Sequence, residues 1–442
     1  MKLKHTFIFL FFWSISFNAQ NIYTYAGIGT CTANSGDGGP ATSAQVYLPI
    51  GIASAFNNLY FTTGYYSTLR LVNNAGIIST LAGGGSSLGD GGTATLAQFY
   101  NPRGIELDPM GNIYIADGQN HRIRKINTSG IVNTIAGNGV PGFSGDGGLA
   151  TTANIREPWD VALDAIGNVY FADAGNHRIR KIDTGGIITT VAGIGTAGFS
   201  GDGGLASLAQ LYSPQAIELD ATGNIYVVEF GNNCVRKINS SGVITTIAGI
   251  GGLYGNTGDG GLATLAKLGN PRGLALDASG NIYVADYAFG TIRKINTAGI
   301  ISTIVGTGVP GYSGDNGPAI NAQISPQHIA LDADGNILIA DGSNHRIRIV
   351  CINSCAIGVE EYGDANDEIK IFPNPANNLL KMDFGILDVK SSQIEIINSL
   401  GVRVLRTNST NQIDVSSISE GIYNLRLFTT EGVITKKIVI QH

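Results

Sequence analysis

Six aspartates recur at the same place in a Gly-rich stretch, typified by Gly145-Asp146-Gly147-Gly148, and they are the first candidates for chemistry. They are Asp37, Asp90, Asp146, Asp202, Asp259 and Asp315. A ring of carboxylates could bind calcium, but calcium takes about six to eight oxygens, usually with several carboxylates from one loop. Each stretch here offers one. Asp is also favoured in turns and at helix N-caps, so we interpret these aspartates as structural, each in a Gly-rich turn before one helical turn.

Three histidines also occupy equivalent places, namely His121, His177 and His345. Three imidazoles can hold a zinc ion, but equivalent places in separate repeats keep their side chains apart. Hydrogen bonding within their own turn is the better interpretation. We therefore expect no metal site and no cofactor.

Four cysteines are present, at Cys31, Cys234, Cys351 and Cys355. None of them forms a C-x-x-C pair, which excludes a zinc ribbon and a thioredoxin motif. An exported chain can oxidise its thiols. Because Cys351 and Cys355 are close in sequence, we predict a disulfide between them and leave the other two cysteines unpaired.

These candidates belong to a sequence that repeats. The stretch GNIYIADGQNHRIRK begins at Gly111, and related copies begin at Asn57, Gly167, Gly223, Gly280 and Gly335, at intervals of 54 to 57 residues. Each unit contains four short runs, here named strands a, b, c and d, that are rich in β-branched and aromatic residues and bounded by turn residues. A fixed period of this size indicates a repeat architecture, and four antiparallel strands per unit are the pattern of a propeller blade.

The ends of the repeat array indicate a closed ring. The last unit has strands a, b and c, up to Ile349, but lacks strand d. The run from Asn21 to Gly27 has the pattern of the missing strand, and its pairing with the last unit would remove exposed sheet edges. We therefore predict an all-β protein with a six-bladed propeller whose last blade is completed by the N-terminal strand.

The units resemble NHL repeats over roughly residues 21–350. The D-x-x-N-H-R-I signature stands at Asp117–Ile123, Asp173–Ile179 and Asp341–Ile347. WD40 repeats are the weaker alternative, because their unit is shorter, at about 40–45 residues. The first residue of the signature is a structural repeat position, represented by Asp117, Asp173, Asp286 and Asp341.

Arginines hold one position on strand c of every unit. They are Arg70, Arg124, Arg180, Arg236, Arg293 and Arg348. We interpret them as structural, with the stem packed between blades and the guanidinium paired with acidic or backbone groups. With a formal net charge of −6 and 14% charged residues, the chain lacks the basic footprint of a nucleic-acid-binding protein.

Positions where the units differ are better candidates for ligand binding than positions where they agree. Directly after the Pro that begins strand a, the units supply Arg103, Trp159, Asp160, Gln215, Arg272 and His328. Strand a is innermost in a propeller, so these side chains should gather at the channel opening, a common place for a ligand. The alternative is that they only fill and solvate the opening. The order of the strands puts the connections from strand d to the next strand a on the face that carries this opening. These connections contain the Gly-Asp-Gly-Gly stretches, so we expect the stretches around the opening. We predict a protein or glycan ligand there.

An enzyme is the alternative function. The resemblance to lyases among NHL relatives implies a zinc held by several histidines near the channel, but His328 is the one histidine on a strand a. The resemblance to lactonase-type propellers implies a metal site formed by inward Glu, Asn and Asp side chains. Glu106 and Glu218 are present here, but the sequence has no matching set around them. We therefore predict a binding or scaffold module, with a metal-dependent lyase or hydrolase at the channel opening as the second hypothesis.

Both ends of the sequence indicate export. Residues 1–19 combine Lys2 and Lys4, an apolar run over 7–17 and a small residue before Gln20, which is typical of a signal peptide. Its apolar run is too short to span a bilayer, and no transmembrane segment is expected in the mature chain. After an acidic, unpatterned linker over 356–367, residues 368–442 contain seven short alternating runs, which predict a small β-sandwich.

The last segment resembles the type A C-terminal sorting domain of the type IX secretion system. The residues that carry the resemblance are Phe372–Ala376, Asn398–Gly401, Gly421–Tyr423 and Lys436–Ile440. The resemblance implies that the type IX machinery is a partner and that the protein is secreted or displayed on the outer membrane after export to the periplasm. The predicted order is a signal peptide over 1–19, a propeller over 20–355, a linker over 356–367 and a sorting domain over 368–442.

Overall fold

The structure is a computed structural model that describes residues 20–30, 32–352, 370–372, 376–383, 393–398, 403–408, 412–429 and 432–441. It divides into two compact units, Met1–Ala356 and Ile357–His442. The predicted signal peptide over 1–19 and linker over 356–367 lie outside the described residues. Within the described ranges, no helix has both the length and the apolar composition that crossing a membrane requires.

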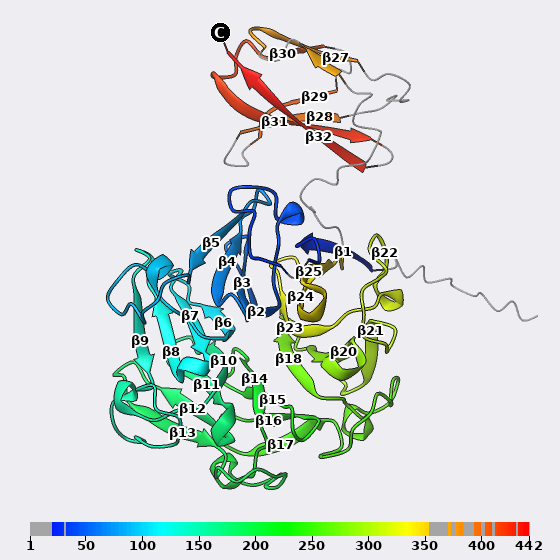
Figure 1. Cartoon of the computed structure of the whole chain (residues 1–442). Coiled ribbons are helices and arrows are strands. Elements are labelled where there is room, and N and C mark those ends of the chain that lie inside the picture. The colour runs from blue at the N-terminus through cyan, green and yellow to red at the C-terminus, as the bar shows by residue number, and fades with distance from the viewer. Residues whose placement is uncertain are drawn as a thin grey trace, which may run out of the picture. The chain divides into compact units, whose positions relative to one another are not determined.

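In the first unit, six antiparallel sheets are arranged radially around one axis (Figure 1), which confirms the predicted six-bladed propeller. Blades one to five are four-stranded sheets in chain order. Blade one contains β2 (Pro49–Ala55), β3 (Asn58–Thr63), β4 (Thr68–Val72) and β5 (Ile78–Ala82); blade two contains β6 (Pro102–Leu107), β7 (Ile113–Asp117), β8 (Arg122–Ile126) and β9 (Val132–Ala136); blade three contains β10 (Pro158–Leu163), β11 (Val169–Asp173), β12 (Arg178–Ile182) and β13 (Ile188–Ala192). Blade four contains β14 (Pro214–Leu219), β15 (Ile225–Glu229), β16 (Cys234–Ile238) and β17 (Ile244–Ala248); blade five contains β18 (Pro271–Leu276), β19 (Ile282–Asp286), β20 (Thr291–Ile295) and β21 (Ile301–Val305).

Blade six combines the two ends of the propeller. It contains β23 (Pro326–Leu331), β24 (Ile337–Asp341), β25 (Arg346–Val350), the N-terminal strand β1 (Asn21–Ala26) and the two-residue β22 (Gly317–Pro318). β1 pairs antiparallel with β25, with Ile22 opposite Val350 and Thr24 opposite Arg348. The N-terminal strand therefore closes the ring, as predicted.

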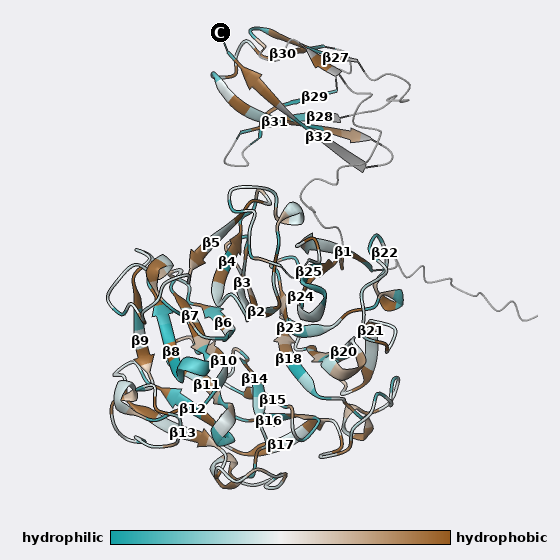
Figure 2. Cartoon of the chain, in the orientation of Figure 1, coloured by the Kyte–Doolittle hydropathy of each residue, from teal (hydrophilic) through white to brown (hydrophobic). Residues whose placement is uncertain are grey.

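The strands of each blade are apolar on both faces because every blade packs between two others. Figure 2 shows hydrophobic segments within the strands of all blades. The middle residues of strand b, such as Phe171 of β11 and Val227 of β15, are fully buried. The innermost strands β2, β6, β10, β14, β18 and β23 contact one another in a closed ring, and their inward residues line the channel.

Each arginine of strand c joins its blade to the preceding connecting segment. All six are fully buried, and each is ion-paired with the repeat aspartate of that segment. In blade three, Arg180 Nη2 donates to Asp146 Oδ1 at 2.7 Å and to the Ser144 carbonyl at 2.8 Å. Thr190 Oγ1 donates to Asp146 Oδ2 at 2.6 Å. The guanidinium partners are thus the acidic and backbone groups that the sequence predicts.

The same contacts correct the predicted position of the Gly-Asp-Gly-Gly stretches. Asp146 contacts Arg180 of β12 and Thr190 of β13, which are the two outer strands of blade three. The stretches therefore lie over the outer strands and not around the channel opening. The strand order determines which strand ends are connected, but the buried arginine determines how far from the axis the connection lies. One 3₁₀ turn follows each stretch: η1 (Ala41–Ser43), η2 (Ala94–Leu96), η4 (Ala150–Thr152), η6 (Ala206–Leu208), η7 (Ala263–Leu265) and η9 (Ala319–Asn321).

The three repeat histidines join neighbouring blades. Each follows a 3₁₀ turn between strands b and c, namely η3 (Gly118–Asn120), η5 (Ala174–Asn176) or η10 (Gly342–Asn344), and has a left-handed backbone. Nδ1 accepts a hydrogen bond from a backbone N–H of the next blade: His121 from Glu157 at 3.2 Å, His177 from Ser213 at 3.2 Å and His345 from Leu48 at 3.1 Å. The expected bonding within the turn is wrong in this respect, because these bonds reach the next blade. Burial lowers the pKa of all three imidazoles, which favours the neutral form that accepts.

The described residues of the second unit contain seven strands in two sheets, as predicted. One sheet contains β26 (Lys370–Phe372), β27 (Leu379–Asp383) and β30 (Gln412–Asp414); the other contains β28 (Gln393–Ile397), β29 (Arg403–Thr407), β31 (Gly421–Thr429) and β32 (Gly432–Ile440). Leu380 of the first sheet and Ile396 and Leu425 of the second belong to one buried cluster. The two sheets therefore form a sandwich around a single core.

Two of the four cysteines have a described state. Cys351 is disulfide-bonded, and Cys234 is a free thiol. Cys234 is fully buried in β16, and burial raises the pKa of its thiol well above the usual value. Cys31 and Cys355 lie outside the described residues, so the Cys351–Cys355 pairing stays a prediction.

Candidate functional site: the axial channel

The channel residues that break the repeat lie on a backbone irregularity shared by all blades. In every blade the pairing of strands a and b shifts register directly after the first Pro of strand a. Such a bulge changes the direction of the side chains beside it. The second position holds Ile50, Arg103, Trp159, Gln215, Arg272 and Gln327, and the third holds Gly51, Gly104, Asp160, Ala216, Gly273 and His328.

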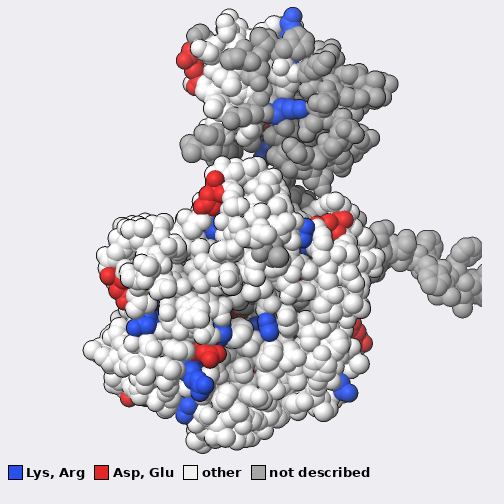
Figure 3. Space-filling model, in the orientation of Figure 1, with Lys and Arg blue, Asp and Glu red and all other residues white. Residues whose placement is uncertain are grey.

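Two guanidinium groups and aromatic rings form the opening of the channel. The guanidinium carbon of Arg103 lies 3.6 Å from the centre of the Trp159 ring. Arg272 lies 3.7 Å from the centre of the Tyr287 ring and 5.9 Å from Trp159. On the face shown in Figure 3, basic and acidic atoms lie near the centre of the ring, and most of the surrounding surface is uncharged.

The guanidinium groups keep hydrogen-bonding capacity. Arg103 is 5% exposed, and its Nη1 has no hydrogen-bond partner among the described residues; the same is true of Arg272 Nε. Glu157 approaches Arg103 at 3.8 Å, and Arg272 Nη1 donates to Gln327 Oε1. Burial lowers the pKa of Arg103 to about 10; Glu157 opposes this shift and Arg272 adds to it. The opening is therefore an electropositive site with unpaired donors.

One level deeper, a hydrogen bond crosses the channel. His328 of β23 and Asp160 of β10 belong to blades six and three, on opposite sides of the ring, and His328 Nε2 lies 3.4 Å from Asp160 Oδ2. The Asp160 carboxylate also accepts from Val161 N–H at 2.9 Å and Ile217 N–H at 3.0 Å. These backbone donors hold the carboxylate in place, so the pair forms a fixed barrier between the opening and the rest of the channel.

Glycines at the third position make room for this pair. A Cβ on Gly104 would lie 1.8 Å from Asp160 Oδ1, and a Cβ on Gly273 would lie 2.7 Å from the His328 Cα. Real Cβ atoms do not approach other atoms this closely. The Asp160 side chain therefore depends on the absence of a side chain at position 104, whereas Gly273 leaves room for the backbone of the next blade at His328.

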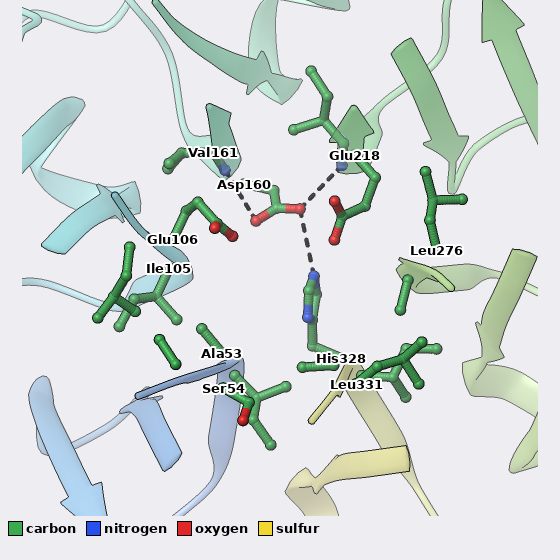
Figure 4. Close-up of a pocket in the computed structure, with 17 residues that line it drawn as sticks. Ala53, Ser54, Ile105, Glu106, Asp160, Val161, Glu218, Leu276, His328 and Leu331 are labelled. Carbon is green, nitrogen blue, oxygen red and sulfur yellow. Dashed lines mark hydrogen bonds and ion pairs between the residues drawn. The ribbon is translucent and has the colours of Figure 1, made fainter. Parts of the chain in front are cut away.

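Beyond the Asp160–His328 bond the channel widens into a cavity of about 250 Å³. Figure 4 shows Glu106 and Glu218 on either side of Asp160, with His328 reaching it from the opposite wall. Most of the remaining lining is aliphatic, including Ile52, Leu276 and Leu331. The cavity thus has three carboxyl groups in one region and an apolar wall elsewhere.

The two glutamates resist ionisation in this cavity. Burial raises the pKa of Glu106 to about 8, and the charge of Asp160 adds to the rise. Burial also raises the pKa of Glu218 well above its usual value, with further contributions from the charges of Glu106 and Asp160. Glu106 therefore tends to hold a proton at neutral pH, and ionisation of Glu218 is disfavoured by the same causes. The cavity favours positive charge or hydrogen-bond donors in a ligand.

The structure divides the six predicted ligand residues between two places. Arg103, Trp159, Gln215 and Arg272 lie at the second position of strand a, whereas Asp160 and His328 lie at the third position and line the cavity. Arg103 stacks on Trp159, so that part of the ring is not free for a sugar.

Glu106 and Glu218 were not predicted as site residues. A signal for them exists in the sequence. Both occupy the fifth position of strand a, and the other four repeats have alanine there: Ala53, Ala162, Ala275 and Ala330.

No group of three or more His, Cys, Asp or Glu side chains within the described part of the chain is arranged to hold a metal ion. The repeat histidines face backbone N–H groups, and the repeat aspartates face arginines. Neither the repeat histidines nor the repeat aspartates converge on one point.

Family models match both units of the chain. The Teneurin NHL domain model matches residues 84–143, 141–199, 195–257 and 252–310, which together span about half of the chain. An NHL repeat model matches residues 324–350, and the secretion system C-terminal sorting domain model matches residues 370–441. The protein SUPPRESSOR OF QUENCHING 1, chloroplastic, of Arabidopsis thaliana is 28% identical over 277 residues, 58% of this chain. The chain spans 25% of the length of that protein.

Solved structures show the same fold at low sequence identity. A Bacteroides thetaiotaomicron protein of unknown function is 20% identical, with a TM-score of 0.57, and the match covers 75% of this chain and 76% of the other. An auxiliary nutrient binding protein from the same species is 16% identical, with a TM-score of 0.56 and the same coverage. With the repeat signature, the closed ring of six blades and the family matches together, the chain belongs to the NHL-repeat family of β-propellers and has a secretion system C-terminal sorting domain, which indicates secreted or cell-surface export.

Proposed function

We propose that this protein is an exported binding module that binds a protein or carbohydrate ligand at the channel opening. The sorting domain supports export through the type IX machinery, and the pattern of residues 1–19 supports a first step through a signal peptide into the periplasm. The fold similarity to an auxiliary nutrient binding protein is compatible with a binding role, although fold alone does not determine function.

The observation that supports the site best is the pair of guanidinium groups, Arg103 and Arg272, that lie at one opening of the channel, each stacked on an aromatic ring. The one acidic side chain near Arg103 in the described part of the chain is Glu157, at 3.8 Å. A carboxylate or another anionic group of a ligand would pair with this positive charge. Trp and Arg are also residue types that often dominate binding energy.

The contacts at the opening distinguish residues that would touch a ligand from residues that support them. Trp159 supports Arg103 by stacking, so its role is to hold the guanidinium in position. Arg272 is the more accessible of the two arginines and is oriented by Tyr287 and Gln327. We therefore assign direct ligand contact to Arg103 and Arg272, with Trp159 and Gln215 positioned beside them.

A protein and glycan array probed with the purified exported chain would identify the ligand. Arg272→Ala and Trp159→Ala should each weaken binding by more than about 1 kcal/mol, roughly fivefold or more, while the melting temperature stays nearly unchanged. Arg272→Lys keeps the charge but loses the planar fork, so it should also bind more weakly. Met110→Ala, an exposed apolar position in an a–b turn, is the control. Equal effects of Met110→Ala and Arg272→Ala would place the site elsewhere.

A further inference from the structure

The cavity beyond the Asp160–His328 bond is separate from the arginine opening. Its lining begins at the third position of strand a and continues to the later residues of the same strands, such as Ser54 and Leu331. The arginines occupy the second position and are not part of the lining. A ligand in this cavity would therefore meet different chemistry from a ligand at the opening.

The ionisable groups of this cavity are three acids and one imidazole. Glu106 comes from β6, Asp160 from β10, Glu218 from β14 and His328 from β23, whereas β2 and β18 contribute no charged residue. The lining has no lysine or arginine. An anionic ligand is therefore disfavoured in this part of the channel.

His328 provides an independent sign that a hydrogen-bond partner is missing. Its side chain is 9% exposed and projects from β23 toward Asp160 across the cavity (Figure 4). Nε2 lies at hydrogen-bond distance from the Asp160 carboxylate, which leaves Nδ1 as the second polar atom of the ring. Nδ1 is buried and has no partner among the described residues. Such a buried polar atom is costly unless a hydrogen-bond partner reaches it.

We propose that this axial cavity binds a small primary ammonium compound with an aliphatic body. An ammonium group has three N–H donors and no acceptor, which suits Glu106, Glu218 and the nearby imidazole. Its positive charge would compensate the acidic groups that converge in the cavity. This site is distinct from the proposed ligand site at the opening and does not depend on it.

The size of the cavity and its aliphatic side chains limit the body of the ammonium compound to a short chain. Ile52, Leu276 and Leu331 line the cavity around the acidic groups. A volume of about 250 Å³ corresponds to the share of roughly eight water molecules in the liquid. An amine with a short alkyl chain fits such a volume, and burial of its methylene groups adds to the affinity.

Binding of a cation should release protons. The pKa of Glu106 is about 8 in the protein, so this carboxyl is mostly protonated at pH 7. A bound ammonium group favours the carboxylate, and the displaced proton leaves to solvent. The affinity should therefore rise as the pH increases from 6 to 8, because less proton remains to be displaced. The other ionisable groups that face the same space are Asp160, Glu218 and His328.

Calorimetric titration of the full exported chain with three compounds of similar size tests the charge preference. The compounds are n-butylammonium chloride, n-butanol and sodium pentanoate, each at pH 7. We expect one n-butylammonium per chain, with n-butanol and pentanoate at least tenfold weaker. A weakly buffered titration with a pH electrode should record acidification with n-butylammonium alone. Equal binding of n-butanol, or no binding of n-butylammonium up to millimolar concentration, overturns the proposal.

Variants locate the site. Glu106→Gln and Glu218→Gln should each weaken n-butylammonium binding at least tenfold, and Glu106→Gln should reduce the acidification. Asp334→Asn is the matched control, because Asp334 is an exposed carboxylate in the a–b turn of blade six and does not line the cavity. Neither glutamine variant should lower the melting temperature, since each replaces a buried carboxyl, whose charged form burial disfavours, with a neutral amide of similar size. Unchanged affinity in both glutamine variants contradicts the site.

A calcium titration separates an organic cation from a metal ion. If n-butylammonium binds and calcium chloride does not compete with it, the ammonium assignment is supported. If calcium chloride binds at lower concentration and excludes n-butylammonium, the cavity is a metal site and the proposal is wrong. A response of Arg272→Ala in this assay would also contradict the separation of the two sites, whereas failure of the ammonium assay leaves the ligand site at the opening untouched.

Discussion

Removal of β1 should open the propeller, and the cost can be estimated from its contacts. Ile22 is fully buried, and burial of such a side chain stabilises a protein by about 1.5–3 kcal/mol. Tyr23 and Tyr25 are partly buried against a second hydrophobic cluster, on the other side of the strand from Ile22, and they add about 1 kcal/mol each. Backbone N–H groups of Asn316, Ala319 and Cys351 donate to β1 and to Gln20 at 2.7–3.0 Å, and each such bond adds about 1 kcal/mol.

Together these contacts contribute roughly 6–8 kcal/mol, which is comparable with the total stability of a typical domain, about 5–15 kcal/mol. A chain that begins at Ile28 should therefore melt at least about 10 °C below a chain that begins at Gln20, at roughly 2–4 °C per kcal/mol for a domain of this size. Differential scanning calorimetry measures this directly. The loss exposes the edge of β25, so aggregation above the transition should also increase.

A pair of point variants separates strand pairing from a general effect of truncation. Ile22→Ala removes a fully buried side chain and should cost about 2–5 kcal/mol. Ile28→Ala changes the same residue type directly after β1, where the side chain is 41% exposed, and should change stability by less than about 0.5 kcal/mol. If the Ile22→Ala variant and the truncated chain both have the melting temperature of the full chain, β1 does not complete blade six and the ring closes in another way.

Four further outcomes are expected. A chain ending at Asn366 should reach the periplasm and accumulate there, because it lacks the sorting domain; normal levels on the cell surface in fractionation experiments would contradict this role. Arg180→Met should lower stability in urea unfolding by about 3–5 kcal/mol, because it leaves the buried Asp173 carboxyl without its cation, whereas the exposed Arg406→Met should have little effect. His177→Phe should lower stability by about 1 kcal/mol at pH 7.5, and this difference should shrink as the pH falls below 6.5, because the lowered pKa of His177 means that its contribution is present at high pH and lost on protonation. Peptide mapping without reduction should identify a Cys351–Cys355 disulfide; a cross-link from Cys351 to Cys31 would refute that pairing.

The blades were predictable because each repeat contains its own strand and turn signals. GNIYIAD and its copies contain a continuous apolar run, which is typical of a strand buried on both faces. The Asp–x–x–Gly turn before each run indicates the a–b hairpin. Closure was predictable from a missing strand at one end and an extra one at the other. The first signal lies within a single repeat and the second comes from the number of strands at each end of the array. Neither depends on the distances between blades.

The wrong expectations concern contacts between elements that are distant in sequence. Asp146 and Arg180 are 34 residues apart, and nothing in either segment indicates that one lies over the other. His121 likewise bonds to Glu157 N–H, 36 residues away in the next blade. The aspartate–arginine pair occurs in all six repeats and the histidine bond in three, so the repeat reveals their importance but not the identity of the partner.

The site was partly predictable because a departure from the repeat is visible in the sequence. Arg103, Trp159 and Arg272 stand out where neighbouring units have small or different residues. The depth of each residue in the channel was not visible, because the bulge after Pro places the second and third positions at different levels. Glu106 and Glu218 do not match the lactonase pattern, but glutamate at a position where the other repeats have alanine is itself an indication of a site on the innermost strands.

The departures from the repeat are also related to one another across blades. Asp160 occupies space that Gly104 of the preceding blade leaves open, and His328 occupies space beside Gly273. The Asp160 side chain thus requires glycine at position 104 of the preceding blade, so at this point the channel composition depends on two neighbouring repeats together. Packing alone does not require an imidazole opposite a carboxylate, because alanine or glycine fills the third position in the other four blades. The polar pair and the two glutamates are therefore additions to a channel that the fold could line with small apolar residues, and this is the physical reason for seeking ligands along the axis rather than in the repeated loops.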